Sequence, residues 1–396
     1  MSQLKVNAIS DAAGANGNAI TLATDGTCTA KITSNLSNRN LIINGAMQVN
    51  QRVSTPGLDD FNPVTSALYT LDRWILGNGS SFDTDSMRIK QVSDSPDEFS
   101  NSLRVDIGNT ETPGAGQNAA IAQRIEAQHL QHLAYGTSSA KSCTLSFWVR
   151  SNKTGTYCLQ VNQHDSGKYV LYEYTISSSN TWEKKTITFS GNTSDAIAND
   201  NGRGLDINWH LTCHSDDHVA ATTTWTAKPG GGTGSAYLAT SNQVNLWDNS
   251  NNAWYLTGVQ LEVDNGSGVA TDFEHRSYSD ELARCQRYFY SLVNGSGQTV
   301  GMASYYGDTK WRIPISFPTT MRANPSMVCS NNTGDFTGHS SAGAVNVATI
   351  GDWHNAASLT TGTLGSNSIP DNNYDGQASY IKTSNSTSSI TFSAEL

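Results

Sequence analysis

Apolar and polar residues alternate along several short stretches of this chain. Between residues 205 and 213 one parity is apolar throughout and the other is polar throughout. Because successive side chains of a β-strand point to opposite faces, this period of two predicts a half-buried strand and excludes a helix. The apolar set is Leu205, Ile207, Trp209, Leu211 and Cys213.

The same alternation returns at 143–149, 170–176 and 255–263, with clusters of Gly, Asn and Ser between these segments. Short strands separated by turn residues are typical of a sandwich or barrel. We therefore expect an all-β fold whose main β domain spans residues 41–275. Residues 1–40 hold too few apolar side chains to bury a core, which predicts an extended N-terminal arm that orders against a partner.

A different periodicity appears after residue 275. Ser277 and Asp280 fit the start of a helix, because a serine caps the backbone of a residue three positions on. Five apolar residues then follow at spacings of four and three, and predict a short helical connector at 276–292. These residues are Tyr278, Leu282, Cys285, Phe289 and Leu292. We call these five residues the seam. Two roles for the seam remain open: packing on the protein's own sheet, or joining three copies near a three-fold axis.

Residues 293–396 return to the period of two and predict a C-terminal β-sandwich head. One predicted strand, at 311–317, contains Pro314. Because proline lacks the N–H that a sheet ladder needs, we expect this strand at an edge or a bulge. The last alternation, at 390–396, predicts that the C-terminal end is tied into a sheet.

Composition narrows the function classes. The formal net charge is -10 and the longest Lys/Arg cluster is the pair Lys184 and Lys185, so the chain lacks the basic surface of a nucleic-acid binder. No apolar run approaches the ~18 residues of a membrane span, and the first residues lack a secretory signal, so we expect no membrane insertion and folding in a cytoplasm. The six scattered cysteines predict free, mostly buried thiols.

Six segments carry a resemblance: NLIINGAMQVNQR at 40–52, YTLDRW at 69–74, LSFWVRS at 145–151, TGVQLEV at 257–263, FEHRSY at 273–278 and ELARCQRYFY at 281–290. Together they resemble one known family, tail-fibre-like proteins common in marine phages. Residues 317–325 are similar to the entry of a C-terminal fibre head. Residues 4–11 are similar to virion-attachment segments of cyanophage-type structural proteins.

The resemblance implies a central jelly-roll sandwich like that of carbohydrate-binding modules. It also implies a phage tail-fibre subunit that is made in the host cytoplasm and located in the virion. Residues 1–40 would attach to other tail or virion proteins, the distal β domains would bind a host-surface glycan, and three copies would form a homotrimer. Two alternatives remain: a purely structural collar, tail or capsid fibre component, and a tailspike glycan hydrolase.

Two segments contain residue types that bind metals. In an extended strand His210 and His214 lie about 13 Å apart, at ~3.3 Å per residue, which is too far for two bonds of ~2.1 Å to one ion. We expect solvated histidines at a strand end there. The segment from Asp371 to Gly376 matches half of a calcium loop, but the twelfth position is Lys382 rather than Glu, so a turn is expected. The sequence predicts no cofactor.

The carboxylates offer little support for catalysis. A glycan hydrolase needs two of them about 5 to 10 Å apart. The candidates lie on or beside predicted strands, where alternation predicts ordinary solvent-facing positions: Glu126, Asp165, Glu173 and Glu262. The chain also lacks a G-x-S-x-G elbow, a phosphate-binding loop and the repeats of a β-helix depolymerase. We expect no enzymatic activity.

Aromatic residues at polar positions favour binding instead. Trp148 occupies an even position, whereas the apolar residues of 143–149 occupy odd positions, so its side chain points to the other face of the predicted strand. Its ring either covers the C–H face of a sugar, beside Asn and Asp that bond the hydroxyls, or packs under another layer. In the predicted head, Trp353, His354 and Tyr374 lie in Gly/Asn-rich loop sequence, where recognition residues concentrate. These four residues are the candidate receptor contacts.

Overall fold

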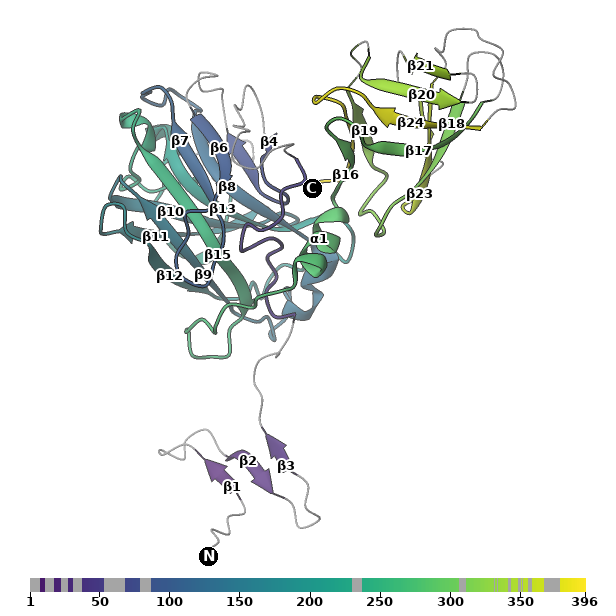
Figure 1. Cartoon of the computed structure of the whole chain (residues 1–396). Helices are drawn as coiled ribbons and strands as arrows, with labels where there is room; N and C mark the ends of the chain where they lie inside the picture. The colour runs from purple at the N-terminus through teal and green to yellow at the C-terminus, as the bar shows by residue number, and fades with distance from the viewer. Residues whose placement is uncertain are drawn as a thin grey trace, which may run out of the picture.

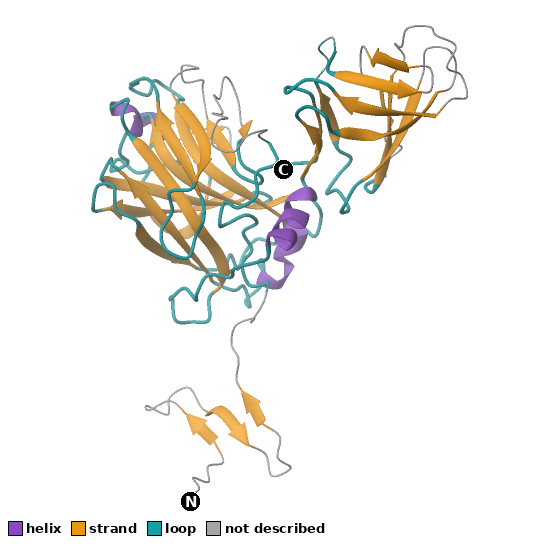
Figure 2. Cartoon of the chain, in the orientation of Figure 1, coloured by secondary structure: helices purple, strands orange, loops and turns teal. Residues whose placement is uncertain are grey.

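The structure, a computed structural model, is built almost entirely of β-strands, and this confirms the all-β expectation (Figures 1 and 2). It describes residues 8–10, 18–22, 28–30, 38–52, 68–78, 87–229, 237–305, 311–330, 332, 334–340, 343–347, 350, 352–354, 358–366 and 378–396. Figure 1 shows a large lobe, a smaller lobe and a small sheet near the N-terminus.

The large lobe, called the sandwich below, consists of two antiparallel sheets. The first contains, in spatial order, β14 (Thr222–Ala227), β11 (Lys168–Ile176), β10 (Gly155–Gln163), β13 (Arg203–Cys213), β8 (Asn118–Glu126), β5 (Ile75–Asn78) and β4 (Leu68–Tyr69). The second contains β12 (Glu183–Phe189), β9 (Cys143–Ser151), β15 (Ala253–Val263), β7 (Ser102–Ile107) and β6 (Met87–Val92). Consecutive strands often lie in different sheets, so the chain crosses repeatedly between the two layers. The connections include the 3-10 helices η1 (Ala127–Leu133), η2 (Ser215–Asp217) and η4 (Leu246–Asp248).

Alternation explains how the two sheets enclose a core. The strand predicted at 205–213 is confirmed as β13, and Trp209 on its apolar face is fully buried. The ring of Trp209 lies 5.6 Å from that of Trp74 and 5.6 Å from that of Phe147 in the facing sheet. Aromatic pairs at this separation add to the stabilisation from burial alone.

The polar face of β13 is buried as well, and the expectation of solvated histidines is wrong for His210, which is 3% exposed. Residues 237–243 lie over this face. The side chain of Gln243 donates to the backbone carbonyl of His210 at 3.2 Å, and that of Gln160 donates to the carbonyl of Tyr237. A loop distant in sequence thus forms a further layer, which local alternation does not reveal.

Near the N-terminus, β1 (Ala8–Ser10), β2 (Asn18–Leu22) and β3 (Cys28–Ala30) form a three-stranded antiparallel sheet. Figure 1 shows this sheet apart from the sandwich. The N-terminal segment predicted as an extended arm therefore contains short strands of its own.

The helix predicted at 276–292 is shorter than expected. It is α1 (Tyr278–Gln286), and the hydroxyl of Ser277 caps it by accepting from the N–H of Asp280 at 3.2 Å, as the sequence predicts. Phe289 then begins β16 (Phe289–Asn294), so Phe289 and Leu292 lie on a strand. Their helical spacing is coincidental, because pairing with the last strand of the chain sets the conformation here.

The small lobe, called the head, also packs two antiparallel sheets. One contains β16, β25 (Ser389–Ser393) and β19 (Ser326–Cys329). The other contains, in spatial order, β21 (Gly343–Val347), β20 (Phe336–Ser340), β24 (Ala378–Thr383), β17 (Thr299–Tyr305), β18 (Trp311–Ser316), β23 (Thr361–Ser366) and β22 (Asp352–His354). The core between them includes Trp311, Ile381 and Phe392, all fully buried.

β18 is not an edge strand, contrary to the expectation drawn from Pro314. It lies between β17 and β23. Its described pairing with β17 involves Trp311 and Arg312 alone, whereas Pro314 pairs with Thr363 of β23. The ladder with β17 ends before the proline, and a proline is therefore tolerated inside this sheet.

The last residues cross from the head to the sandwich. Glu395 forms ion pairs with Arg52 at 2.6 Å and with Arg73, whose side chain is 1% exposed. The carbonyl of Leu396 accepts from the hydroxyl of Tyr69 at 2.8 Å and from Arg124. The C-terminal end is tied down, as the alternation predicted, although its final contacts are with the other lobe (Figure 1).

Five of the cysteines are free thiols: Cys143, Cys158, Cys213, Cys285 and Cys329. Burial raises the pKa of Cys143 to about 12, so this thiol stays protonated and unreactive at neutral pH. In the described part of the chain, no helix has the length and apolar character needed to cross a membrane.

Candidate functional site

The outer face of the five-stranded sheet carries a cluster of aromatic and charged side chains. Tyr255 of β15 pairs with Arg104 of β7 on one side and with Arg150 of β9 on the other. Two residues further along β15, Thr257 pairs with Trp148. Because residues two apart on a strand share a face, these side chains belong to one surface. The predicted receptor contact Trp148 therefore lies on the outside of the sandwich, partly exposed.

Cations hold the ring of Tyr255 from both sides. The guanidinium carbons of Arg104 and Arg150 lie 5.3 and 4.9 Å from the ring centre, within cation–π range. Asp94 fixes Arg150 in turn, since its carboxylate oxygens accept from Arg150 at 2.7 and 2.6 Å. Trp182 packs edge-on against Tyr255 with ring centres 6.0 Å apart. These contacts fix the side chains of Tyr255, Arg150 and Trp182 relative to one another before a ligand binds.

The aromatic side chains continue past Gly258. Its φ is +59°, and a Cβ there would come within 2.7 Å of Phe99 and 2.8 Å of Trp148, so only glycine fits. Phe99 contacts Phe273 at 5.0 Å between ring centres, and Phe273 contacts His275 at 4.9 Å. We call the following residues the aromatic surface: Trp182, Tyr255, Trp148, Phe99 and Phe273.

Two adjoining hollows lie beyond His275, beside α1. The first, of about 610 Å³, is lined by His275 and by Arg276. The second, of about 330 Å³, shares Asn38, Arg284 and Arg287 with the first. Both volumes fall in the ~300–1,000 Å³ range of ligand pockets.

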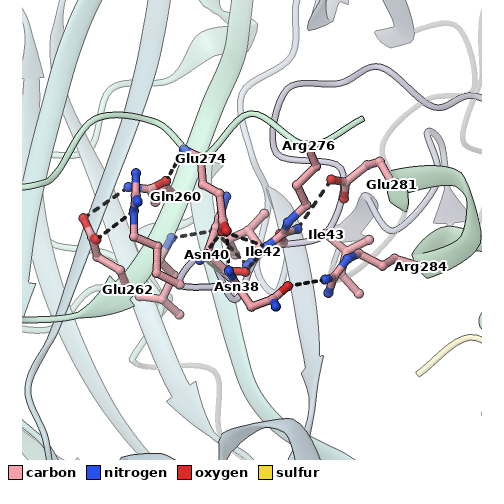
Figure 3. Close-up of polar contacts among 12 residues, drawn as sticks. Asn38, Asn40, Ile42, Ile43, Gln260, Glu262, Glu274, Arg276, Glu281 and Arg284 are labelled. Carbon is pink, nitrogen blue, oxygen red and sulfur yellow. Dashed lines mark hydrogen bonds and ion pairs between the residues drawn. The ribbon is translucent and has the colours of Figure 1, made fainter. Parts of the chain in front are cut away.

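One carboxylate anchors residues 38–40 beside these hollows (Figure 3). Glu274 accepts from the backbone N–H of Asn38 and, at 2.8 Å, from that of Asn40. The N–H of Glu274 donates to the side chain of Gln260 in β15 at 2.8 Å. Arg284 of α1 donates to the side-chain oxygen of Asn38 at 2.6 Å. The segment that follows the N-terminal arm is thereby fixed to the sandwich and to α1.

Arg276 joins the same network. It pairs with Glu274 at 3.3 Å and with Glu281 of α1 at 3.4 Å. Glu281 also accepts from the backbone N–H of Asn44. Both acids are therefore paired with Arg276 (Figure 3), and Glu274 also lines the larger hollow.

Glu126 and Glu262 are buried, and the expectation that they face solvent is wrong. Glu126 accepts from Arg287 at 3.0 and 2.6 Å and from the hydroxyl of Tyr288 at 2.6 Å. Burial raises the pKa of Glu126, but these hydrogen bonds outweigh it and leave the pKa below its ordinary value. Glu262 pairs with Arg39 at 3.7 Å. Each carboxylate is held in a structural ion pair.

The remaining predicted receptor contacts belong to the head. Trp353 and His354 lie in β22 rather than in a loop, which corrects the expectation for both. Trp353 pairs with Leu364, a fully buried residue of β23. Tyr374 and the calcium-like segment 371–376 lie outside the described residues. The structure thus brings Trp148 together with other aromatic residues of the sandwich, whereas β22 belongs to the head.

The five seam residues have different environments. Tyr278 is 55% exposed, whereas Cys285 and Phe289 are buried. Leu282 and Leu292 are half-buried. They do not form one helical stripe, because the helix ends at Gln286. Tyr278 is the member of the set that another chain can reach most easily.

The histidines of β13 and its following turn do not form a metal site. Within the described ranges, no group of three His, Cys, Asp or Glu side chains is placed to hold a metal ion. His210 is buried, neither of its ring nitrogens has a hydrogen-bond partner, and burial lowers its pKa to about 4. The Nδ1 of His214 accepts from the backbone N–H of Asp216 at 3.2 Å. His214 therefore caps η2.

The alternation predicted at 255–263 puts Tyr255 and Leu261 on one face, because both are odd positions, and this is wrong. The pairing of β15 with β9 shifts between Thr257 and Gln260, so a bulge at Gly258 reverses the parity of the strand. Tyr255 consequently faces outward while Leu261 faces the core. A glycine inside a strand pattern is a known mark of a bulge and was the available signal.

No family model and no curated protein matches the chain. Similar solved structures include the enzymatically active domain of bacteriophage CBA120 tailspike protein 4, with 16% identity over 59% of this chain and 24% of that chain at a TM-score of 0.30. A putative sugar binding protein from Bacteroides thetaiotaomicron has 12% identity over 57% of this chain and 100% of its own, at a TM-score of 0.32. TmCBM61, in complex with β-1,4-galactotriose, has 10% identity over 57% and 100%, at a TM-score of 0.28.

This chain spans about a quarter of the tailspike chain. Similarities at these identities and TM-scores do not indicate a function for this chain. The function is inferred from the arrangement of its side chains.

Proposed function

We propose that this chain binds a glycan through the aromatic surface of the sandwich. The observation that carries the proposal is the pair of partly exposed rings, Trp148 and Trp182, beside a Tyr255 that Arg104 and Arg150 hold in place. Aromatic faces cover the apolar C–H faces of sugar rings, and neighbouring charged groups bond the hydroxyls. Side chains that are ordered before binding lose less entropy when the ligand arrives.

We further propose that the protein is a homotrimeric subunit of a phage tail fibre. The resemblance of residues 40–52, 145–151 and 281–290 to tail-fibre-like proteins supports this role. In it, residues 1–40 attach to other virion proteins and the exposed Tyr278 lies toward a neighbouring copy. The protein holds its receptor and does no covalent chemistry.

Incubation of the purified protein with host-surface polysaccharide distinguishes this function from the two alternatives. A glycan-binding subunit retains the polysaccharide without shortening it, a hydrolase shortens it, and a purely structural component does neither. Retention is measured by affinity electrophoresis and chain length by size-exclusion chromatography. Absence of retention refutes the proposal.

A further inference from the structure

The smaller hollow has an unusual charge for this molecule. It lies between η1, residues 38–43 and the end of α1, and its ionisable side chains are Arg284, Arg287, His129 and His132. No acidic side chain lines it, although the chain as a whole has a formal net charge of -10. An anion entering this hollow therefore meets cations and imidazoles without a lining carboxylate.

Arg284 supplies the unbalanced charge. Glu126 already neutralises Arg287 through two hydrogen bonds. Arg284 instead donates to the neutral side chain of Asn38, and it forms no ion pair with any carboxylate that the structure describes. A guanidinium has five N–H donors in a planar fork that matches carboxylate and phosphate oxygens. Donors of Arg284 thus remain available to a ligand.

The rest of the wall suits a sugar ring. Leu41 and Ile43 line the hollow and are half-buried, which offers apolar surface to C–H groups. Asn38 lines it as well, and amide groups are typical partners of sugar hydroxyls. The larger hollow, which begins at His275 next to the aromatic surface, leads to this one through shared residues.

We infer that the smaller hollow binds the anionic group of an acidic sugar, with Arg284 bonding its carboxylate or phosphate oxygens and Leu41 and Ile43 against the ring. The inference rests on the proposed glycan-binding function and adds a class of glycan to it. That class consists of polymers that carry uronic-acid carboxylates or sugar phosphates.

The imidazoles make this binding depend on pH. Burial lowers the pKa of His129. The charges of Arg287, Arg284 and Arg73 lower this pKa further, whereas the charge of Glu126 raises it. Burial and then Lys141 lower the pKa of His132, against a backbone hydrogen bond that raises it. Both rings are therefore neutral in the empty hollow at pH 7. An anion favours their protonated forms, so affinity should rise as pH falls from about 7.5 toward 5.5.

The test uses three small probes, galacturonate, galactose 1-phosphate and galactose, titrated into the full chain by calorimetry. We expect one or both anionic probes to bind at least about 10-fold more tightly than galactose. Arg284→Gln should abolish that preference, and Arg284→Lys, which keeps the charge, should retain part of it. Lys382→Gln in the head removes the same charge far from the hollow and should change nothing. Thermal unfolding of each variant checks that it folds.

The two anionic probes also separate the two sources of charge, because the probe that binds more tightly identifies carboxylate or phosphate as the preferred group. The pH dependence is measured with galacturonate, because a sugar phosphate itself gains a proton at about pH 6. If neither probe binds better than galactose, or if Arg284→Gln binds them as the wild type does, the inference is wrong. Failure of the proposed function has a different signature. In that case the wild type binds a free anionic sugar but retains no host polysaccharide, or Trp148→Ala retains it fully.

Discussion

The sandwich and the head present aromatic side chains in opposite ways. In the sandwich, Tyr255 is 6% exposed and lies between two arginines. In the head, Tyr380 of β24 and Met302 of β17 pair across the sheet and are 40% and 66% exposed. His339 of β20 stacks on Tyr380 with ring centres 4.9 Å apart and planes 8° apart.

The difference distinguishes two kinds of surface. Rings flanked by ordered charges are arranged in advance for a polar ligand, because their side chains lose conformational entropy during folding rather than on binding. An exposed apolar row is more typical of a contact with another protein. The comparison supports the proposal that the sandwich recognises a glycan. The exposed pair of the head is the kind of surface that contacts another protein.

Separating the two lobes should have the largest effect. Glu395→Ala leaves Arg73, which is 1% exposed, without its carboxylate, and breaking one side of a buried ion pair costs about 3–5 kcal/mol. Urea unfolding measures the loss. The control is Lys153→Ala, which removes an exposed pair with Asp248 and should cost under about 1 kcal/mol. Equal losses in the two variants would mean that Glu395 does not join the lobes.

Acid should destabilise the sandwich before the head. Burial lowers the pKa of His210 from 6.5 to about 4, so between these pH values the unfolded chain binds a proton that the folded chain does not. The neutral form of buried His210 therefore contributes to the free energy of unfolding. This contribution is complete above pH 6.5 and is lost as pH falls toward 4, by about 1.4 kcal/mol per pH unit. Urea midpoints from pH 7 to 4.5 measure the slope. His210→Gln should flatten it, and an unchanged slope would assign the acid sensitivity to other groups.

Removing one ring from each surface decides which lobe binds the glycan. Trp148→Ala should weaken binding of host polysaccharide by about 10-fold or more, since truncating a central aromatic contact of a binding site costs about 1–2 kcal/mol. Tyr380→Ala should bind as the wild type does. Affinity electrophoresis compares the two variants. The opposite result would move recognition to the head and would make the clustered arginines of the sandwich a packing feature.

The smallest effect on folding is expected at Tyr278, on the helix between the lobes. Because its side chain is 55% exposed, Tyr278→Asp should change the free energy of unfolding by under about 0.5 kcal/mol. Cys285→Asp, which places a charge at a fully buried position, should destabilise the fold by several-fold more. If three copies meet along α1, Tyr278→Asp lowers the trimer fraction in sedimentation without moving the urea midpoint. An unchanged trimer fraction would remove Tyr278 from the assembly surface.

The local part of the fold was predictable from the sequence, because strand alternation and helix capping depend on near neighbours. The strand at 205–213 and the cap at Ser277 are both confirmed. The end of α1 was not predictable in this way, because Phe289 takes its strand conformation from pairing with Ser393. The burial of His210 likewise depends on contacts with residues 237–243.

The candidate site was predictable only in part. Trp148 was identified because its parity differs from that of its apolar neighbours. Tyr255 was assigned to the wrong face, because the bulge at Gly258 reverses the parity within β15. Asp94 and Arg284 act through partners far away in the sequence, and neither carries a local signal.

The anchor at residues 38–40 determines how a pull on the N-terminal arm would be carried. Asn38 and Asn40 are bonded through their backbones to Glu274, and the N–H of Leu41 donates to the carbonyl of Leu261 at 2.8 Å. Leu261 belongs to β15 and pairs on its other side with Leu145 of β9. Tension would therefore load several hydrogen bonds together and spread into the middle of the sheet instead of unzipping one edge. A tether attached in this way resists shear, and it would hold the sandwich against a moving load while the arm is stretched.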